Sequence, residues 1–502
     1  MGKSLTDIGN EGSPWLQGLK LKANLMRWSE LKALNEASPL SPDWLNEPRH
    51  VHIVGAGGIG MSALGHILLA RGHRVSGSDA NVNAQTEALA KGGAIVFQGH
   101  TASNIEGAGT LVISSAISED NPEVVAARAD GIPVFHRAQL MAALSNGAKV
   151  SLAVSGTHGK STTSAMMAHI LTETGANPTA ILGAVYPPFG SNVRVGDPDL
   201  VVVEADESDG SFTLLHATVA TILNVEPEHL ENYDDNPKVL WDAFEMFATN
   251  AQKTVLNGDA GLRKSPFKDD PFVQYYSFTS GHLLAKNIQS VPGAMRFDLF
   301  FGPASCGTFS LPVAGKHNVS NALAALASVA QARGVKSPLQ FGAMARTLES
   351  FAGTLRRMER KGETNGVLVV DDYGHHPTEV AATLRAAKDF YARPLTVVFQ
   401  PHRYSRTQQL GHEFGPSFEA ADRIIITELY SAFETPIEGV SGKIVLDAVK
   451  KSFPGKPILW ANNLDEARQL VLENVGSGEL VVTMGAGDIT RLGPQILNSL
   501  QK

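Results

Sequence analysis

Short apolar runs that end in polar or glycine-rich stretches recur along the whole chain. The run at 150–154 (VSLAV) leads into a glycine turn and then an apolar helix that begins at Lys160. A similar run at 51–54 leads into glycines and an apolar helix that continues to Ala70. Buried strands that alternate with helices favour an α/β fold with parallel sheets. Further strands are expected at 74–77, 94–97, 110–114, 132–135, 200–203, 221–225, 367–370, 395–399, 423–427 and 480–483.

Two stretches depart from this pattern. Residues 272–313 alternate in places between apolar and polar side chains, which predicts an antiparallel flap. Residues 1–48 scatter tryptophans and leucines among lysines and arginines, without the continuous apolar core of a signal peptide. For this extension we expect a helix or two packed on the body, with a partner-binding arm as the alternative.

The composition is that of an ordinary globular protein. The 502 residues suggest about three domains of ~150 residues each. The net charge of −8 disfavours a nucleic-acid surface, which needs a concentrated basic face. No apolar run approaches the ~18 residues of a membrane span. Cys306 is the only cysteine, so no intrachain disulfide can form, which fits a cytoplasmic protein.

The turn after 150–154 reads Ser-Gly-Thr-His-Gly-Lys-Ser-Thr-Thr and opens a helix. Strand, glycine turn, Lys-Ser and helix are typical of a phosphate-binding loop, where backbone N–H groups and the helix N-terminus face the phosphates. Lys160 would then reach the outer phosphates and Ser161 would hold Mg²⁺. The full pattern has glycine where this chain has Val154, and the alternative is a tight turn with a surface lysine. The candidate nucleotide-binding residues are Gly156, Thr157, His158, Gly159, Lys160, Ser161 and Thr162.

Acidic and polar residues follow other strands of this central region. Four acids lie within six residues from Glu204, directly after the apolar run 200–203, which indicates a cation site with Glu204 as the best ligand. His229 lies among carboxylates and is either a second metal ligand or a hydrogen-bonded loop histidine. Asn318 and Asn321 open an alanine-rich helix, where they either cap the helix or contact a nucleotide base.

The glycines of Gly-Ala-Gly-Gly-Ile-Gly at 55–60 fit a dinucleotide-binding loop, and Asp79 lies 19 residues after Gly60. This arrangement offers a helix N-terminus to a pyrophosphate and an acid to a ribose hydroxyl. Both a nicotinamide dinucleotide and a UDP-sugar carry these groups. The candidate ligand-binding residues of this region are Gly55, Gly57, Gly58, Gly60, Asp79, Ser114 and Ser115.

Three strands of the C-terminal region also run into polar motifs. These are Asp-Asp-Tyr-Gly-His-His at 371–376, Gln-Pro-His-Arg-Tyr-Ser-Arg at 400–406 and Gly-Ala-Gly-Asp at 485–488. Open α/β sheets bind ligands at the carboxyl ends of their strands. The first motif is tempting as a metal cluster, but we prefer a site for a polar substrate beside the nucleotide.

Seven motifs together resemble the Mur ligase family, the ATP-dependent amide-forming enzymes of peptidoglycan synthesis. They cover residues 51–491 in the family's order. Ser208 and the His-Arg-Tyr-Ser-Arg run favour the member that joins L-alanine to UDP-N-acetylmuramate; the ligase that adds L-alanyl-γ-D-glutamyl-diaminopimelate to the same sugar is the alternative. The motifs are GAGGIGMSALG from Gly55, SGTHGKSTT from Ser155, EADESDGSF from Glu204, GKHNVSN from Gly315, DDYGHHPTE from Asp371, FQPHRYSRT from Phe399 and TMGAGDI from Thr483.

The resemblance implies a fold and an order of domains. After an N-terminal extension (1–48), it implies a Rossmann-like UDP-substrate-binding domain at 49–148. A central P-loop ATPase domain at 149–348 and a C-terminal Rossmann-like domain at 349–502 would follow. It also implies reaction through an acyl phosphate, closure of the domains before chemistry, and a monomer or homodimer.

Residue roles also follow from the resemblance. It implies that Lys160 contacts the phosphates. It also implies that a first Mg²⁺ is bound by Ser161 and Glu204, and a second by Glu204 and His229. Arg357 would reach the phosphates from the third domain. Residues His317, Asn318 and Asn321 would lie near adenine, and the alanine and the muramyl carboxylate would be surrounded by Tyr373, His375, Arg403 and Arg406. Two readings outside the family remain: a nicotinamide dehydrogenase and a nucleotide-switched binding protein.

Overall fold

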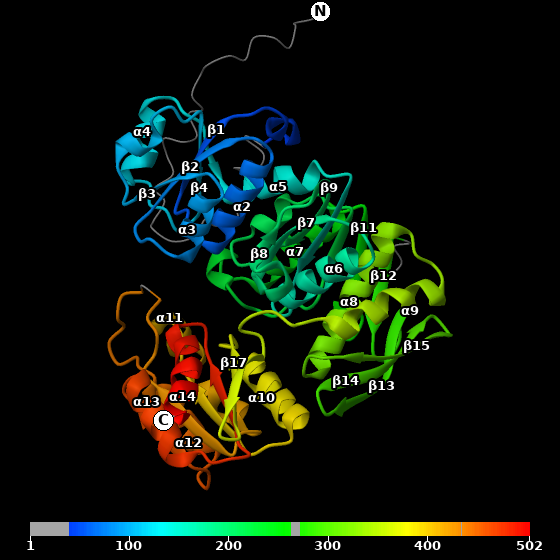
Figure 1. Cartoon of the computed structure of the whole chain (residues 1–502), viewed down its shortest axis with the longest axis vertical. Coiled ribbons are helices and arrows are strands. Elements are labelled where there is room, and N and C mark those ends of the chain that lie inside the picture. The colour runs from blue at the N-terminus through cyan, green and yellow to red at the C-terminus, as the bar shows by residue number, and fades with distance from the viewer. Residues whose placement is uncertain (1–39, 263–271, 433, 502) are drawn as a thin grey trace, which may run out of the picture. The chain divides into compact units, whose positions relative to one another are not determined.

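The computed structural model describes residues 40–262, 272–432 and 434–501. Most of the extension at 1–48, where we expect a helix or two, lies outside the described residues, and its described part contains a short 3₁₀ helix at Pro42–Asn46. The chain divides into two compact units (Figure 1). One contains the described residues up to Leu140 together with His229–Asn236. The other contains Met141–Glu228 and Pro237 onward. Each unit is built around parallel sheet, as the alternation of strands and helices predicts.

The first unit contains a parallel sheet with the strand order β3-β2-β1-β4-β5. The strands β1, β2 and β4 are buried over most of their length, as a sheet covered on both faces requires. The chain order reverses between β1 and β4, which is where sheets of this kind bind their ligands. The elements are β1 (His50–Val54), α2 (Ile59–Ala70), β2 (Arg74–Asp79), α3 (Ala84–Lys91), β3 (Ile95–Gln98), β4 (Thr110–Ile113), α4 (Pro122–Ala129) and β5 (Val134–His136).

The second unit begins within α5 (Arg137–Asn146) and its first sheet has the order β15-β14-β13-β12-β11-β10-β6-β9-β7-β8 in the described residues. Strands β12, β11, β10, β6, β9 and β7 pair in parallel, whereas β13, β14 and β15 pair antiparallel and confirm the predicted flap over most of its length. The bounds are β6 (Val150–Ser155), α6 (Lys160–Glu173), β7 (Pro178–Tyr186), β8 (Ser191–Arg194), β9 (Asp197–Glu204), β10 (Val219–Ile222), α7 (Pro237–Thr249), β11 (Lys253–Asn257), β12 (Val273–Ser277), β13 (Leu283–Val291), β14 (Ala294–Phe301), β15 (Ala304–Leu311), α8 (Lys316–Arg333) and α9 (Pro338–Thr347).

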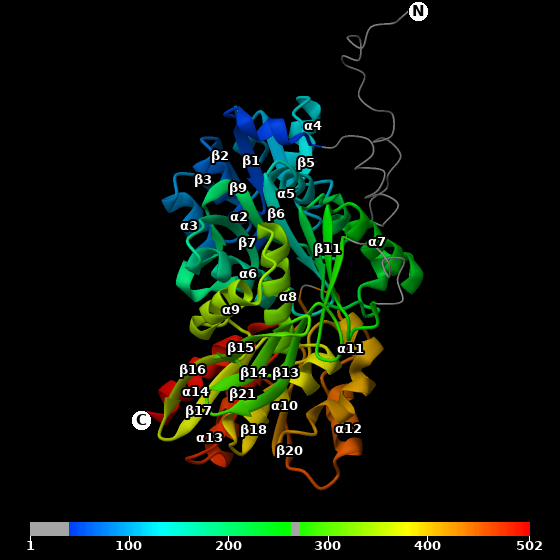
Figure 2. The same ribbon diagram turned by 90° about the vertical axis from the view of Figure 1, so that its right-hand side faces the viewer.

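The helices α6 and α8 pack against each other and against this sheet (Figures 1 and 2). Small side chains make the close approach possible, because α8 buries a run of alanines between Ala322 and Ala330. The core they share also contains the flap residues Phe297 and Phe309. The first turn of α6 is thereby fixed to the rest of the unit, which matters because the phosphate loop ends there.

The remainder of the second unit is a sheet with the order β16-β17-β21-β18-β19-β20, parallel except for β16. Successive residues of β17 face opposite sides, since Leu368 and Val370 belong to one apolar cluster and Val367 and Val369 to the other. Helices therefore cover both faces. The bounds are β16 (Glu359–Thr364), β17 (Val367–Asp372), α10 (Pro377–Tyr391), β18 (Leu395–Phe399), α11 (Tyr404–Leu410), β19 (Arg423–Thr427), α12 (Lys443–Ser452), β20 (Ile458–Ala461), α13 (Leu464–Asn474), β21 (Leu480–Met484) and α14 (Leu492–Leu500).

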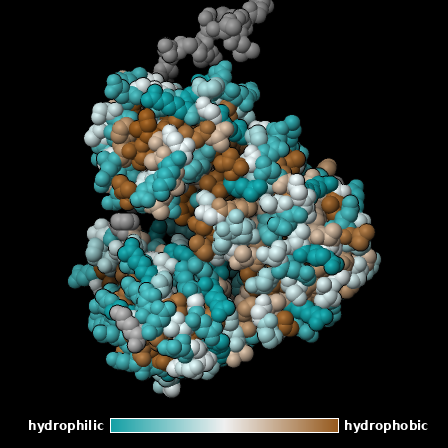
Figure 3. Space-filling model, viewed as in Figure 1, coloured by the Kyte–Doolittle hydropathy of each residue, from teal (hydrophilic) through white to brown (hydrophobic). Residues whose placement is uncertain are grey.

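The visible surface is mainly hydrophilic, with hydrophobic residues gathered in places (Figure 3). No helix among the described residues combines the length and the apolar character that crossing a membrane requires.

A buried carboxylate ties the elements of the first unit together. The side chain of Glu123 is fully buried, and its Oε2 accepts a hydrogen bond of 2.6 Å from the Ser78 hydroxyl. Its Oε1 accepts a bond of 2.6 Å from the Asn104 amide. The rings of His52 and His100 lie 3.7 and 3.1 Å from its oxygens. Burial alone would raise the pKa of Glu123, but these four partners stabilise the charged form and lower it to about 2.

We expect Glu123→Gln to destabilise the first unit at neutral pH by about 3 kcal/mol. This is the free energy that corresponds to lowering the pKa of Glu123 from 4.5 to about 2 on folding. Because the folded pKa is the lower one, this contribution is present above pH ~4.5 and is lost as the pH falls toward 2. Amide hydrogen exchange of β1 and β2 at several pH values measures it. A variant whose protection equals that of the parent at pH 7 contradicts the assignment.

Candidate functional site

The loop between β6 and α6 has the backbone of an anion-binding turn. Gly156 and Gly159 have φ values of 138° and 90°, which L side chains rarely adopt. A Cβ at Gly159 would also lie 2.6 Å from the Asn321 side-chain oxygen. Gly159 is the N-cap of α6, so the first N–H groups of a 14-residue helix point toward the loop.

Asn224, two residues after β10, holds this loop in shape. Its side-chain oxygen accepts a bond of 2.8 Å from the His158 N–H, and its amide donates to the His158 carbonyl at 3.0 Å. Its own carbonyl accepts from the Thr157 N–H at 3.3 Å. The sequence placed Asn224 inside a strand at 221–225, whereas β10 ends at Ile222. Asn224 therefore lies outside the strand, and its side chain can hydrogen-bond the loop.

Lys160 is held against the acidic run that follows β9. Its Nζ lies 2.7 Å from Glu207 Oε2 and donates to the Gly156 carbonyl at 2.8 Å. Burial would lower the pKa of Lys160, but the charges of Glu207, Asp206 and Glu204 outweigh it and raise the pKa. The lysine is therefore a fixed cation beside the loop with Glu207 as its partner, and not a surface lysine. Its contact with the outer phosphates stays a prediction.

Ser161 and Glu204 lie together, as predicted. The Ser161 hydroxyl donates to Glu204 Oε1 at 3.2 Å, and the Gly183 N–H of β7 donates to Oε2 at 2.8 Å. Burial raises the pKa of Glu204, so a nearby cation would stabilise its charged form. A Cβ at Gly183 would clash with this carboxylate. Two hard oxygen donors in this position suit Mg²⁺.

The start of α8 lies beside the loop. Asn318 donates to the Ala314 carbonyl at 2.7 Å, and Asn321 donates to the Asn318 side chain at 3.0 Å. Both asparagines are buried, whereas His317 is exposed. Neither asparagine caps α8, because its N-cap is Gly315 and has no side-chain cap bond. The capping alternative is thus not what the structure shows.

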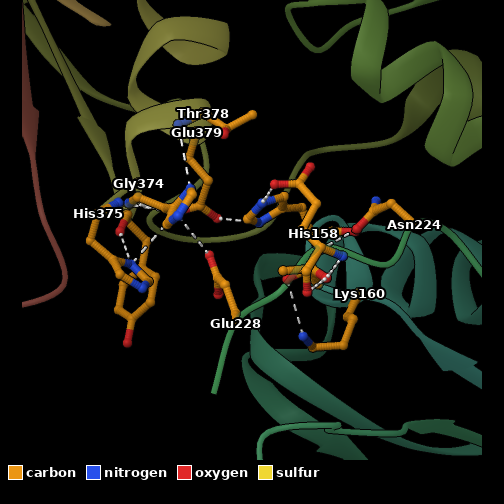
Figure 4. A network of polar contacts seen from close by, with 12 residues as sticks. His158, Lys160, Asn224, Glu228, Gly374, His375, Thr378 and Glu379 are labelled. Carbon is orange, nitrogen blue, oxygen red and sulfur yellow. Dashed lines mark hydrogen bonds and ion pairs between the residues drawn. The ribbon is translucent and has the colours of Figure 1, made fainter. Parts of the chain in front are cut away.

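Glu379, in the first turn of α10, joins the phosphate loop to the C-terminal sheet (Figure 4). Its Oε1 lies 3.3 Å from His158 Nδ1 and 3.6 Å from the Arg357 guanidinium, and its Oε2 accepts the His375 N–H at 3.0 Å. Burial would raise the pKa of Glu379, but its positive neighbours hold it well below the ordinary value.

His158 takes part in the same contacts from the other side. Its Nε2 lies 3.4 Å from Glu226 Oε2, opposite the nitrogen that faces Glu379. Burial would lower the pKa of His158, but the two carboxylates raise it to about 10. Nothing in the sequence pattern marks Glu226 or Glu379 as partners of a histidine far away in the chain.

The polar residues at the ends of β17 and β18 form a second cluster. Tyr373 lies under two guanidinium groups, with Arg356 Cζ at 4.7 Å and Arg357 Cζ at 5.3 Å from its ring centre. Its ring also makes an edge contact with His375, with centroids 5.2 Å apart.

His375 and His402 are neutral groups in this cluster. Their ring centroids are 5.9 Å apart, and burial lowers the pKa of His375 to about 3 and that of His402 to about 4. Arg406 acts on both histidines in the same direction, and Arg403 does so on His402. Arg403 is the N-cap of α11 and has a positive φ of 71°. The cluster therefore brings Tyr373, His375, Arg403 and Arg406 together, as predicted.

In the first unit, two strand ends meet at the reversal of strand order. A Cβ at Gly55 would lie 3.2 Å from the Ile117 side chain, so the glycine loop touches the loop that contains Ser114 and Ser115. Asp79 lies at the end of β2, as predicted, and its Oδ2 accepts the Gly57 N–H at 2.9 Å. Asp79 thus shapes the glycine loop, a role that the sequence did not indicate.

The remaining candidates are placed as follows. Gly60 lies in the first turn of α2, and a Cβ there would lie 3.3 Å from the Arg137 guanidinium. Gly58 is the N-cap of the same helix. His229 has a left-handed φ of 56°, and its Nδ1 lies 3.7 Å from Glu231 Oε1.

Comparisons with known proteins agree with this architecture. Residues 50–149 match the family description "Mur ligase family, catalytic domain", residues 154–329 "Mur ligase middle domain" and residues 356–487 "Mur ligase, glutamate ligase domain". Together these matches cover most of the chain. It therefore belongs to the Mur ligase family.

Similar relatives include two proteins named UDP-N-acetylmuramate–L-alanine ligase. The protein of Myxococcus xanthus is 41% identical over 92% of this chain and 98% of its own length. The protein of Desulfotalea psychrophila is 40% identical over 90% of this chain and 99% of its own length. The crystal structure of UDP-N-acetylmuramate–alanine ligase from Thermotoga maritima has 28% identity and a TM-score of 0.77, covering 90% of this chain and 99% of that one. The fold class predicted from the sequence is thereby confirmed.

We expect Asn224→Ala to weaken ATP binding by roughly tenfold or more, because it removes two hydrogen bonds that hold the loop backbone toward the phosphates. Isothermal calorimetry with ATP measures the effect. Asn250→Ala is the matched control. It also removes a partly buried hydrogen bond, from the Asn250 side-chain amide to the Thr213 carbonyl, but away from the loop. Equal ATP affinity in the two variants would exclude the role of Asn224.

Proposed function

We propose that this chain is an ATP-dependent ligase that joins L-alanine to the lactyl carboxylate of UDP-N-acetylmuramate in peptidoglycan precursor synthesis. The observation that carries the proposal is the similarity, over nine-tenths of the chain, to ligases named for these two substrates. The geometry supports it, because one unit contains both a phosphate loop and a cluster of arginines and histidines suited to carboxylates. The ligase that adds L-alanyl-γ-D-glutamyl-diaminopimelate to the same sugar is not favoured.

We assign the substrates to three domains. Residues 49–148 hold the UDP part of the sugar nucleotide, at the strand reversal where Gly55, Gly57, Gly58, Gly60, Asp79, Ser114 and Ser115 lie. Residues 149–348 bind ATP, and residues 349–502 bind the alanine and contact the nucleotide.

A carboxylate is a poor acylating agent, so the lactyl carboxylate first attacks the γ-phosphate of ATP. The bond from the γ-phosphorus to the bridging oxygen breaks, ADP leaves, and the carboxylate becomes an acyl phosphate. The amine of alanine then attacks the carbonyl carbon and phosphate leaves. Little covalent chemistry falls to the protein, which positions the groups and stabilises charge on the transferred phosphoryl group. The loop N–H groups and Lys160 serve the phosphates, and Arg357 adds a second cation from the C-terminal domain.

The oxygen donors fit Mg²⁺. In our proposal Ser161 and Glu204 hold one ion, and Glu204 with His229 holds a second. Bound there, Mg²⁺ supplies positive charge that stabilises the phosphate oxygens. The Gly183 N–H keeps the Glu204 carboxylate oriented, and the partial burial of Glu204 limits its contact with water.

The C-terminal cluster fits the two carboxylates of the reaction. The planar guanidinium groups of Arg403 and Arg406 are suited to paired bonds with the carboxylates of alanine and of the muramyl group. His375 is neutral at physiological pH, so one ring nitrogen can accept a hydrogen bond from the amine of alanine. Tyr373 packs beside both histidine and arginine and limits the space for the amino-acid side chain.

Closure of the ATP-binding part onto the C-terminal part protects the acyl phosphate from water. The contact of Glu379 with His158 is of this kind, since it joins the phosphate loop to α10. In our proposal the enzyme works in the cytoplasm as a monomer or homodimer.

The choice of amine tests the function. With ATP and UDP-N-acetylmuramate, L-alanine should give one phosphate released per amide formed, because the amine completes the acyl transfer. Phosphate release and mass spectrometry of the product measure this. The tripeptide L-alanyl-γ-D-glutamyl-diaminopimelate serves as the competing amine. A better rate with the tripeptide would make the chain a recycling ligase, and no product with either amine would refute both.

The arginine cluster gives a separate test. We expect Arg403→Ala and Arg406→Ala to raise the KM for alanine or UDP-N-acetylmuramate roughly tenfold or more, because losing one partner of a buried charged pair costs on the order of 2–5 kcal/mol. ATP affinity, measured by calorimetry, should change little. The control is Arg385→Ala, an exposed arginine paired with Glu419, whose loss should be nearly silent. Parent-like KM values in both cluster variants would return these arginines to a structural role.

A further inference from the structure

Three potential metal ligands converge where the phosphate loop meets α10. His158 comes from the loop, Glu226 from the segment after β10, and His376 from the N-cap of α10. One ligand atom of each lies within 4.8 Å of the other two. The His158 Nε2 to Glu226 Oε2 distance is 3.4 Å, and the two imidazole centroids are 5.7 Å apart (Figure 4). All three residues are partly buried.

The donor atoms select a class of metal. Two imidazole nitrogens and one carboxylate oxygen are the ligands of many zinc sites, and Co²⁺ and Ni²⁺ accept the same set. Mg²⁺ prefers oxygen donors, so a site in which two of three ligands are imidazole nitrogens disfavours it. Ligand atoms about 2.1 Å from a tetrahedral zinc ion lie roughly 3.4 Å apart, so a small inward movement of the side chains completes the site.

The surroundings resemble those of a metal-binding histidine. Such a histidine usually gives its other ring nitrogen to a carboxylate, which fixes the ring. Glu379 Oε1 lies 3.3 Å from His158 Nδ1, on the side away from Glu226. Glu228 Oε1 lies 3.4 Å from His376 Nε2, where it can supply a fourth ligand atom. The three carboxylates favour a divalent cation between the rings, although Arg357, 3.6 Å from Glu379, offsets part of their charge.

We propose that His158, Glu226 and His376 bind one borderline transition-metal ion, of which Zn²⁺ is the type, with Glu228 as a fourth ligand. None of these residues is among the Mg²⁺ ligands proposed above. Because His158 belongs to the phosphate loop and His376 begins α10, the bound ion ties the ATP-binding domain to the C-terminal domain. Zn²⁺ binding displaces to solvent the proton that Glu226 and Glu379 otherwise stabilise on His158. The bound ion then holds the loop histidine and opposes the entry of ATP.

The test uses the full-length protein without ATP, in excess Mg²⁺ so that oxygen-rich sites are already filled. Calorimetry with Zn²⁺ should show one ion per chain, and Co²⁺ should give the visible absorption of a four-coordinate site. We expect Glu226→Gln and His376→Gln each to weaken Zn²⁺ binding by roughly tenfold or more, and Glu379→Gln by about tenfold through the orientation of His158. Thermal melting confirms that each variant is folded.

The control is His412→Gln, which removes an exposed histidine. It should leave Zn²⁺ affinity unchanged. The absence of Zn²⁺ binding by the unaltered protein in excess Mg²⁺ would overturn the proposal without any variant. Parent-like affinity in both Glu226→Gln and His376→Gln, or an equal loss in His412→Gln, would overturn it as well.

Discussion

The parallel pairing of β10, β6 and β9 is the constraint on which the ATP-binding region depends. Neighbouring parallel strands end at the same edge of a sheet, and each of these strands is followed by a polar loop. The phosphate loop follows β6, the acidic run follows β9, and the Asn224–Glu226 segment follows β10. Lys160, the Glu204 carboxylate and the Asn224 side chain thus lie at one edge of the sheet, although the loops that meet there are up to about 70 residues apart in the chain.

This pairing also divides the work within the acidic run. Glu207 neutralises Lys160, whereas Glu204 faces Ser161 and the Gly183 N–H. Adjacent carboxylates would otherwise repel each other in a buried place. The lysine inserted beside them allows Glu204 to be presented to a cation without leaving Glu207 as an uncompensated charge.

The strand ends and their motifs could be predicted from the sequence, because apolar runs and glycine turns are local signals. The phosphate loop and the acidic run from Glu204 came from such signals. The pairing of Ser161 with Glu204 and the cluster of Tyr373 with His375 were implied by the resemblance to the family. Asn224 could not be found, because its position depends on where β10 ends. Glu379 forms an ordinary capping box with His376, and only the folded chain shows that the same carboxylate reaches His158 and Arg357.

Gly183 shows how a residue without chemistry can carry a functional constraint. Its φ is not in the left-handed region, so backbone freedom does not require glycine there. The space that a methyl group would occupy is filled by the Glu204 carboxylate. A survey of all substitutions at this position would therefore resemble a survey of a catalytic residue, with alanine already harmful. The set of substitutions tolerated at this mid-strand position therefore indicates where the neighbouring carboxylate lies.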